Sequence, residues 1–270
     1  SFNLDKLTVV STDVQTAGKG TRGRSWQSSP GQCAIVTFFV RFPTECSSEF
    51  VNRNAANATQ LLALSTVNAL SKTASSRGCE GISFGVKWPN DVIADGGKIA
   101  GILARAEPSP GPRLDKLILG VGVNLNLSKQ ELDEINANRV VWPATSFIAA
   151  EAAKQKQLKL QDLHGTTGPG GVDVAAFREL LTMDFAKNLK RFFVGGFASV
   201  RESVNALDVY AGRLVKFRVS DEHVVEAKYL GLNESGHIVL QHEGGRQVIY
   251  PSGEIVAEEA EQRTSQNGSA

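Results

Sequence analysis

The chain has 270 residues, of which 41% are hydrophobic and 21% charged, and this composition fits one large domain or a medium domain with a small one. The formal net charge of +1 excludes a global electrostatic argument for nucleic acid or an anionic membrane, although a local basic patch stays open. No run reaches the roughly 18 apolar residues of a membrane span. The three cysteines form no Cys-x-x-Cys pair, which favours a reducing, intracellular and cytoplasmic location.

The first residues show no signal-peptide pattern. Because the sequence has no initiator Met, it leaves room for a natural N-terminus upstream of residue 1. A short β-rich run at 7–11 leads into residues 15–26, here called the glycine-rich loop, which carries a Gly-x-Gly-x-x-Gly string at 18–23. That string marks a dinucleotide site only when a helix follows directly. A loop and a buried strand at 33–41 follow instead, so the pattern predicts strand, loop and strand.

Such a loop can wrap backbone N–H groups and arginines around a phosphate, while Trp26 offers a flat face to a base. The alternative is a mobile basic loop beside a core tryptophan.

Residues 87–101 read Lys-Trp-Pro-Asn-Asp-Val-Ile-Ala-Asp-Gly-Gly-Lys-Ile-Ala-Gly and predict two short strands joined by the turn at Asp95. The ribbon can hold Lys87, Asn90, Asp91 and Lys98 close together, within reach of one anion. The lysines suit phosphate or carboxylate oxygens, and Asp91 with Asn90 suits magnesium. The alternative is an exposed hairpin that merely carries lysines.

Residues 114–126 form an apolar run that predicts a central strand delivering Asn124 and Asn126. Gly120 and Gly122 leave bare backbone on one face, which either admits a ligand or another strand, or serves packing alone. The remaining patterns predict helices at 55–76, from 147 to 153, at 175–193 and near 200–210, strands at 82–86 and 99–106, and a flexible insertion at about 154–173.

From residue 212 the chain changes to four short β runs, at 214–219, 224–230, 237–242 and 247–250, separated by turns. Their spacing of about ten residues predicts a small barrel or sandwich. The tail from 258 has almost nothing to bury and is expected to be disordered.

Three separated segments, at 15–26, 87–103 and 120–126, resemble the glycine-rich loop, the Lys-Trp-Pro-Asn-Asp hairpin and the Gly-x-Gly-x-Asn strand of biotin protein ligases. The terminal β region, with its ending at 252–254, is similar to that family's SH3-like cap. The resemblance implies an α+β fold of the class II synthetase type, a mixed β-sheet with helices packed on one side. It implies a catalytic domain over 1–210, an SH3-like β-barrel domain over 211–257 and a tail at 258–270.

The resemblance also implies a reaction in which biotin and ATP, with Mg2+, give biotinyl-5'-AMP, and a lysine of a biotin carboxyl carrier domain then receives the biotin. Lys98 would contact biotin's carboxylate and the α-phosphate, where charge builds during attack. Lys87 would hold phosphate oxygens, Asp91 would position magnesium, and Asn124 would contact the metal and nucleotide. The expected biotin site comprises Gln15, Gly18, Lys19, Gly20, Thr21, Lys98 and Gly101. The expected adenylate site comprises Arg22, Arg24, Trp26, Lys87, Asn90 and Asn124.

The chain departs from the family pattern in two places. Where the family usually reads Gly-Arg-Gly-Arg, residues 18–21 read Gly-Lys-Gly-Thr, and a lysine keeps the charge but not the bidentate fork. Arg22, displaced by one position, is the residue that would compensate. Family members also carry a Ser-Thr-Asn-like segment roughly two dozen residues before the loop glutamine, whereas only fourteen residues precede Gln15. Either upstream residues are missing from this sequence, or the biotin pocket lacks them.

Three other functions are compatible with parts of this sequence. A lipoate ligase shares the fold and the adenylation chemistry, but the Gln15 loop and the C-terminal cap favour biotin. A bifunctional ligase and transcriptional repressor would need a DNA-binding helical domain, and no such pattern precedes residue 15. A peptide-binding module on a structural protein leaves Lys87, Asp91 and Lys98 unexplained. The oligomeric state and the acceptor carboxylase are not predicted, and no stable nucleic-acid or membrane partner is expected.

Overall fold

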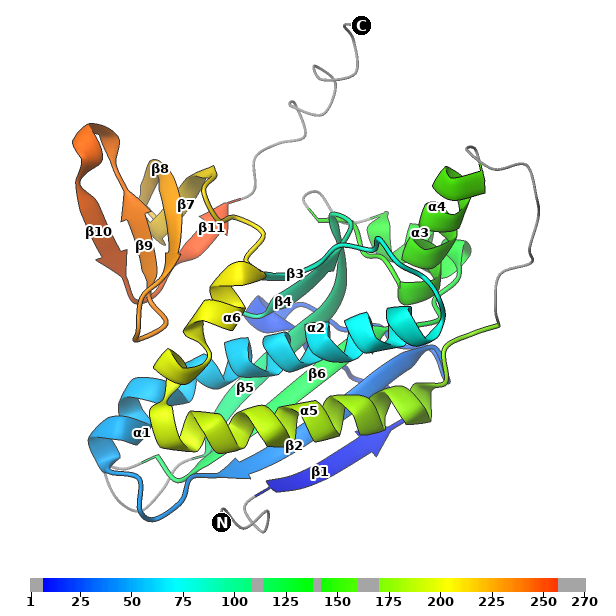
Figure 1. Ribbon diagram of the computed structural model, residues 1–270, viewed down its shortest axis with the longest axis horizontal. Helices are drawn as coiled ribbons and strands as arrows, with labels where there is room; N and C mark the ends of the chain where they lie inside the picture. Colours follow the sequence, from blue (N-terminus) through cyan, green and yellow to red (C-terminus); the bar gives the residue numbers. More distant parts are fainter. Residues whose placement is uncertain (1–6, 108–113, 138–141, 160–169, 257–270) are drawn as a thin grey trace, which may run out of the picture.

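The structure, a computed structural model, describes residues 7–107, 114–137, 142–159 and 170–256. Its main sheet has six strands in the order β1-β2-β6-β5-β4-β3 (Figure 1). The strands are β1 (Leu7–Thr12), β2 (Cys33–Arg41), β3 (Phe84–Lys87), β4 (Asp91–Ala94), β5 (Gly97–Glu107) and β6 (Lys116–Asn124). All five pairings are antiparallel, so the α+β class is confirmed. The parallel part of the expected mixed sheet consists of two isolated bridges, Val86 with Asp208 and Lys98 with Ala144.

The predicted hairpin is confirmed, and β4 and β5 are joined by a two-residue turn. Asp95 and Gly96 adopt φ of 44° and 83°. Positive φ at both positions matches the right-handed twist of the flanking strands, which is why Asp-Gly is favoured there.

Two long helices, α2 (Ala58–Ser76) and α5 (Val174–Gly195), lie side by side across one face of the main sheet (Figure 1). They confirm the helices predicted at 55–76 and 175–193, with a 3-10 turn over Ala55–Asn57. The shorter helices are α1 (Ser48–Asn54), α3 (Lys129–Asn136), α4 (Phe147–Lys159) and α6 (Arg201–Ala206). In the part of the chain that the structure describes, no helix is long and apolar enough to cross a membrane.

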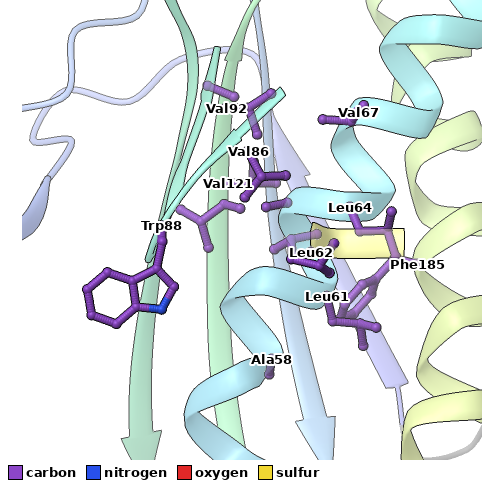
Figure 2. Close-up of a cluster of buried hydrophobic side chains, with 14 of the residues drawn as sticks. Ala58, Leu61, Leu62, Leu64, Val67, Val86, Trp88, Val92, Val121 and Phe185 are labelled. Carbon is purple, nitrogen blue, oxygen red and sulfur yellow. The ribbon is translucent and has the colours of Figure 1, made fainter. Parts of the chain in front are cut away.

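The main core lies between the sheet and α2. Figure 2 shows Leu61, Leu62 and Leu64 of α2 beside strand residues, with Phe185 of α5 behind the helix. Because α2 packs on the sheet and on α5, it is apolar on two sides rather than along one stripe. The opposite face of the sheet is therefore left for other contacts, and it carries the candidate site.

The connection after α4 differs from the expected insertion at 154–173. Helix α4 runs on to Lys159, and residues 160–169 lie outside the described part of the chain. The guanidinium of Arg77 donates to both carboxylate oxygens of Glu151, at 2.8 and 2.7 Å, and to the carbonyl of Gly170 at 2.8 Å. One side chain at the end of α2 thus anchors both α4 and the chain where it returns toward α5.

A second antiparallel sheet follows α6, in the order β10-β9-β8-β7-β11. Its strands are β7 (Leu214–Ser220), β8 (His223–Leu232), β9 (Ile238–Gln241), β10 (Gln247–Tyr250) and β11 (Glu254–Val256). The four predicted β runs are confirmed. Among the described residues β10 and β11 are the edges of this sheet, so closure into an SH3-like barrel stays a prediction. The expected disordered tail at 258–270 lies outside the described residues.

Candidate active site

A β-bulge decides which face of the hairpin Lys98 occupies. If the ladder continued regularly from the pair Asp91 and Gly101, Lys98 would lie opposite Ala94, on the face covered by helices. The register shifts just before Ile93, and Lys98 pairs with Ile93 instead. Because successive side chains alternate between faces, this shift of one residue turns Lys98 to the face that Asp91 occupies.

Lys87, Asp91 and Lys98 form a compact charged group, here called the hairpin site. Asp91 lies 3.5 Å from the ammonium of Lys87 through Oδ2 and 2.5 Å from that of Lys98 through Oδ1. The three side chains are only 14% to 18% exposed. Such pairs are screened far less than charges on a solvated surface, so the alternative of an exposed hairpin that merely carries lysines is wrong. The group carries one net positive charge, which suits an anion.

The backbone of Lys98 is held by a segment that the sequence analysis did not connect with it. Its N–H donates to the carbonyl of Pro143 at 2.7 Å, and its carbonyl accepts from the N–H of Thr145 at 3.0 Å. Both bonds belong to the isolated parallel bridge with Ala144. Lys98 is therefore fixed from two sides, by β4 and by the turn before α4.

Two predicted members of the site, Asn90 and Asn124, donate hydrogen bonds to backbone carbonyls. The amide of Asn90 donates to the carbonyl of Ile102 at 2.9 Å, so it ties the turn after β3 to β5. Asn124 is buried, donates to the carbonyl of Thr145 at 3.0 Å and accepts a bond from the thiol of Cys33 at 3.7 Å. The expectation that Asn90 joins the lysines stays a prediction, and in this structure its amide N–H is bonded to the backbone of β5.

The donor set around Asp91 does not fit a magnesium ion held by the protein. Two ammonium groups already neutralise the only carboxylate of the hairpin site. Asn124, its expected partner, lies two strands away across β5, about 10 Å at ordinary strand spacing. Within the described ranges, no three His, Cys, Asp or Glu side chains are grouped for a metal.

The glycine-rich loop lies between two strands as predicted, without a directly following α-helix, and it folds back on itself. Lys19 and Ser25 form an antiparallel bridge, and the N–H of Trp26 donates to the carbonyl of Gly18 at 2.9 Å. A 3-10 turn at Thr21–Gly23 closes this small hairpin. The guanidinium of Arg24 donates to the carbonyl and to the hydroxyl of Thr21, both at 3.2 Å. Arg24 therefore stabilises the turn and remains exposed.

Trp26 covers bare backbone in the centre of the sheet. Gly101 of β5 and Gly122 of β6 lie opposite each other, and together they are called the glycine floor. A Cβ atom on Gly122 would lie 2.5 Å from Nε1 of Trp26, and one on Gly101 would lie 3.0 Å from its ring and 3.3 Å from the ammonium of Lys98. The indole thus lies on the floor beside the hairpin site. Its buried Nε1 has no hydrogen-bond partner among the described residues.

The other predicted loop residues lie at the rim of this arrangement. Gln15 is exposed, and its Oε1 would lie 2.8 Å from a Cβ atom on Gly18, so its side chain packs over that glycine. Lys19 is exposed, and Gly20 donates its N–H to the carbonyl of Arg24 at 2.6 Å. The side chain of Arg22 lies outside the described part of the structure.

Two aromatic residues beside Lys87 were missed by the sequence analysis. The ammonium of Lys87 lies 6.0 Å from the ring centre of Trp142, within reach of a cation–π contact. Tyr210 packs edge-on against Trp142, with ring centres 6.2 Å apart. Burial raises the pKa of the Tyr210 hydroxyl to about 12, and the nearby Asp208 and Asp91 carboxylates act in the same direction. No spacing pattern connects these residues with the hairpin, so the sequence offered no signal.

Known proteins resemble this chain in sequence and in fold. Residues 1–124 match the model of the Biotin/lipoate A/B protein ligase family. The chain is 31% identical over 245 residues to the biotin--[acetyl-CoA-carboxylase] ligase of Paracoccus denitrificans, covering 89% of this chain and 86% of that protein. It is 24% identical over 249 residues to the bifunctional ligase/repressor BirA of Bacillus subtilis, of which it spans 66%.

Among solved structures, the fold is similar to that of the biotin protein ligase from Aquifex aeolicus in complex with biotin and ATP. The TM-score is 0.64 at 24% identity, over 93% of this chain and 89% of that one. These findings define the class as a biotin/lipoate-type ligase fold built on an antiparallel sheet. The chain belongs to the biotin/lipoate protein ligase family and, within it, to the biotin protein ligases.

Proposed function

We propose that this ligase first joins the carboxylate of biotin to the α-phosphorus of ATP. A carboxylate oxygen forms the new P–O bond, the bond to the β-phosphate bridge breaks, and pyrophosphate leaves. The amine of a lysine on a biotin carboxyl carrier domain then attacks the acyl carbon of biotinyl-5'-AMP. An amide bond forms, the bond to AMP breaks, and the amine loses a proton to solvent.

The single observation that carries this proposal is the hairpin site beside the glycine floor. In the first step negative charge builds on the nonbridging oxygens of the α-phosphate. The ammonium of Lys98 next to Gly101 would stabilise that charge, and Lys87 would hold the neighbouring phosphate oxygens. Since both ammonium groups are already fixed by Asp91, little reorganisation is needed when the charge develops.

Biotin would lie on the glycine floor under the glycine-rich loop, with Gln15 and the backbone of residues 18–21 at its ureido ring. Arg24 and Trp26 would cover the adenylate. Bare backbone admits a flat ligand more closely than any side chain would, which supports this use of Gly101 and Gly122. The indole that now lies on this floor would then move with the ligand or pack on it.

Magnesium is not assigned to a protein site in this proposal, because the donor set around Asp91 does not fit it, and ions of this kind commonly arrive on substrate phosphates. None of the three cysteines forms a disulfide, which supports an intracellular, cytoplasmic location. The two separate sheets support a division into a catalytic domain ending near 210 and a small β domain.

The decisive experiment is ATP–pyrophosphate exchange with biotin and with lipoate as the acid, followed by transfer to a purified carrier domain. The proposal predicts exchange that depends on biotin, and a mass increase on one carrier lysine. Exchange that depends on lipoate alone would favour the second candidate, a lipoate ligase of the same fold. Exchange with neither acid would overturn both.

A further inference from the structure

A buried carboxylate joins the second sheet to the chain segment 207–213, here called the junction segment. Asp208 is 9% exposed, and its Oδ2 accepts a hydrogen bond of 2.5 Å from the hydroxyl of Tyr229 on β8. Its Oδ1 accepts from the N–H of Tyr210 at 2.9 Å. In the described part of the chain no cation pairs with this carboxylate. Burying an unpaired charge is unfavourable, so the two hydrogen bonds must hold it.

The junction segment lies against the strand that carries Lys87. The N–H of Val86 donates to the carbonyl of Leu207 at 2.7 Å, and the N–H of Val209 donates to the carbonyl of Val86 at 3.0 Å. Gly85 permits this approach, because a Cβ atom there would lie 2.9 Å from the carbonyl oxygen of Leu207. Asp208 is thus bridged to the residue immediately before Lys87.

Two ring contacts connect the same parts of the molecule. Trp88, the residue after Lys87, faces Phe217 of β7 with ring centres 6.4 Å apart. Tyr210 of the junction segment packs on Trp142, over which the Lys87 ammonium lies. The backbone on both sides of Lys87 is therefore supported from the junction segment or the second sheet.

We propose that Asp208 and Tyr229 are positioning residues for Lys87: their buried hydrogen bond keeps the junction segment against β3 and so fixes the Lys87 ammonium beside Asp91. The inference rests on the proposed function, in which Lys87 holds the phosphates of ATP. It assigns to the second sheet an indirect role in ATP use, through the hydrogen bond from Tyr229 to Asp208. Burial also raises the pKa of the Asp208 carboxyl to about 6.

The test compares two tyrosine variants of the full chain. Tyr229→Phe removes the hydroxyl that bonds Asp208, whereas Tyr250→Phe removes a hydroxyl of the same sheet that lies 3.1 Å from His242 and away from the junction. We expect Tyr229→Phe to raise the KM for ATP about tenfold while the KM for biotin stays unchanged, because a displaced Lys87 ammonium makes a weaker charge-assisted hydrogen bond to the phosphate oxygens. Tyr250→Phe is expected to leave both constants unchanged.

Substitutions at two further positions, Gly85 and Asp208, test the same contact between the junction segment and β3. Gly85→Ala separates the junction segment from β3 without touching a charge, and it is expected to reproduce the effect on ATP. Asp208→Asn keeps the shape and one acceptor, and it is expected to restore part of the ATP affinity that Asp208→Ala loses. If Tyr229→Phe lowered only the melting temperature, or changed biotin and ATP equally, the positioning role would be refuted.

A second readout does not depend on ligase activity. Hydrogen exchange at the amides of Val86 and Val209 reports directly whether the junction segment stays on β3. We expect faster exchange at both amides in Tyr229→Phe than in Tyr250→Phe. Unchanged exchange would overturn the inference even in an active enzyme. If the two amides exchanged hydrogen faster in Tyr229→Phe but the wild type showed no biotin-dependent ATP–pyrophosphate exchange, the proposed function would be overturned. The inferred contact between the junction segment and β3 would stand.

Discussion

The hairpin site and the glycine-rich loop meet over the glycine floor, but they are held in very different ways. Asp91 lies between two lysines, and all three side chains are mostly buried. Strands β4 and β5 are bonded on both sides, and the edge strand β3 is bonded to β4 and bridged to the junction segment at Val86. The loop at 18–26 is mainly exposed, and it depends on a few backbone bonds and on the link from Arg24 to Thr21. In the proposed reaction, the charges that act on the phosphates are thus fixed before substrate arrives, while the loop that would cover the substrate is held by fewer bonds.

This contrast agrees with what each region must do in the proposed reaction. Stabilising a developing charge requires groups that do not move, because reorganisation would offset the gain. Admitting biotin and ATP and later exposing the adenylate to a carrier lysine requires a cover that opens. The variants below test whether the two regions separate in this way, beginning with the largest expected effect.

Replacing Lys98 by alanine should produce the largest loss. Removing a fixed ammonium from the α-phosphate is expected to lower the rate of biotinyl-adenylate formation about 100-fold to 1000-fold. The fold should persist, because Asp91 keeps Lys87 as its partner. Pyrophosphate release under single-turnover conditions measures the rate, and circular dichroism checks the fold.

The matched control is Lys129→Ala, which removes an 87%-exposed lysine whose partner is Asp133 on the surface. It should leave the rate unchanged. Wild-type turnover in Lys98→Ala would end the assignment of the hairpin site as the catalytic centre.

The buried Asp208 carboxyl of the junction segment should make the free energy of unfolding depend on pH. Burial raises the pKa of the Asp208 carboxyl from 3.8 to about 6. The protonated carboxyl therefore contributes its full stabilisation at pH values below 3.8, and this contribution is lost as the pH rises through about 6. We expect the free energy of unfolding of the wild type, relative to Asp208→Asn, to fall by up to about 3 kcal/mol between roughly pH 4 and 7. Tyr210 and Tyr229 stay protonated throughout this window, since burial raises the pKa of both.

Urea unfolding of both proteins at several pH values measures this difference. A difference that is flat with pH would mean that Asp208 is not buried as an unpaired carboxylate.

Adding one methyl group to the glycine floor should weaken biotin binding under the glycine-rich loop without changing the charges of the hairpin site. Gly122→Ala would push the indole of Trp26 off the floor, and we expect the KM for biotin to rise about tenfold, which corresponds to roughly 1.4 kcal/mol. Gly120→Ala is the matched control on the same face of β6, because its Cβ atom would meet only the carbonyl of Leu103 at 3.8 Å. Steady-state kinetics with each substrate varied in turn would show the effect. Equal behaviour of the two variants would contradict the floor.

The smallest effect is expected in the loop itself. Lys19→Arg restores a planar fork that can bind phosphate oxygens in two places, so release of biotinyl-adenylate should slow severalfold while its formation is unchanged. Rapid filtration after a single turnover measures the release. If formation changed and release did not, Lys19 would belong with the fixed charges and not with the cover.

Most of the fold could be predicted because the strands are β-branched runs bounded by turn residues, and α2 and α5 are long and periodic. Helix α1 was missed, as was α3, although Ser128 and Glu131 form a capping box that could have revealed its start. Strand β11 was missed because three residues carry no usable period.

The sequence predicted that the three charged residues of the candidate site would lie close together, but it did not predict the hydrogen bonds of the two asparagines. Lys87, Asp91 and Lys98 come together as expected, but the bulge that turns Lys98 to this face has no local sequence signal. Asn90 and Asn124 have side chains that could bind a ligand, but in this structure each side-chain amide donates a hydrogen bond to a backbone carbonyl. The neighbourhood of Trp142 and Tyr210 is created by tertiary packing alone.

The anchoring of two distant segments by Arg77 has a practical consequence for engineering. Because α4 and Gly170 are tied to the end of α2, the length of the stretch between residues 160 and 169 can vary while the ends it joins stay in place. Lengthening such a stretch adds only a slowly growing entropy, about 0.6 kcal/mol for each doubling. An affinity tag or a fluorescent reporter inserted there should leave ligation intact.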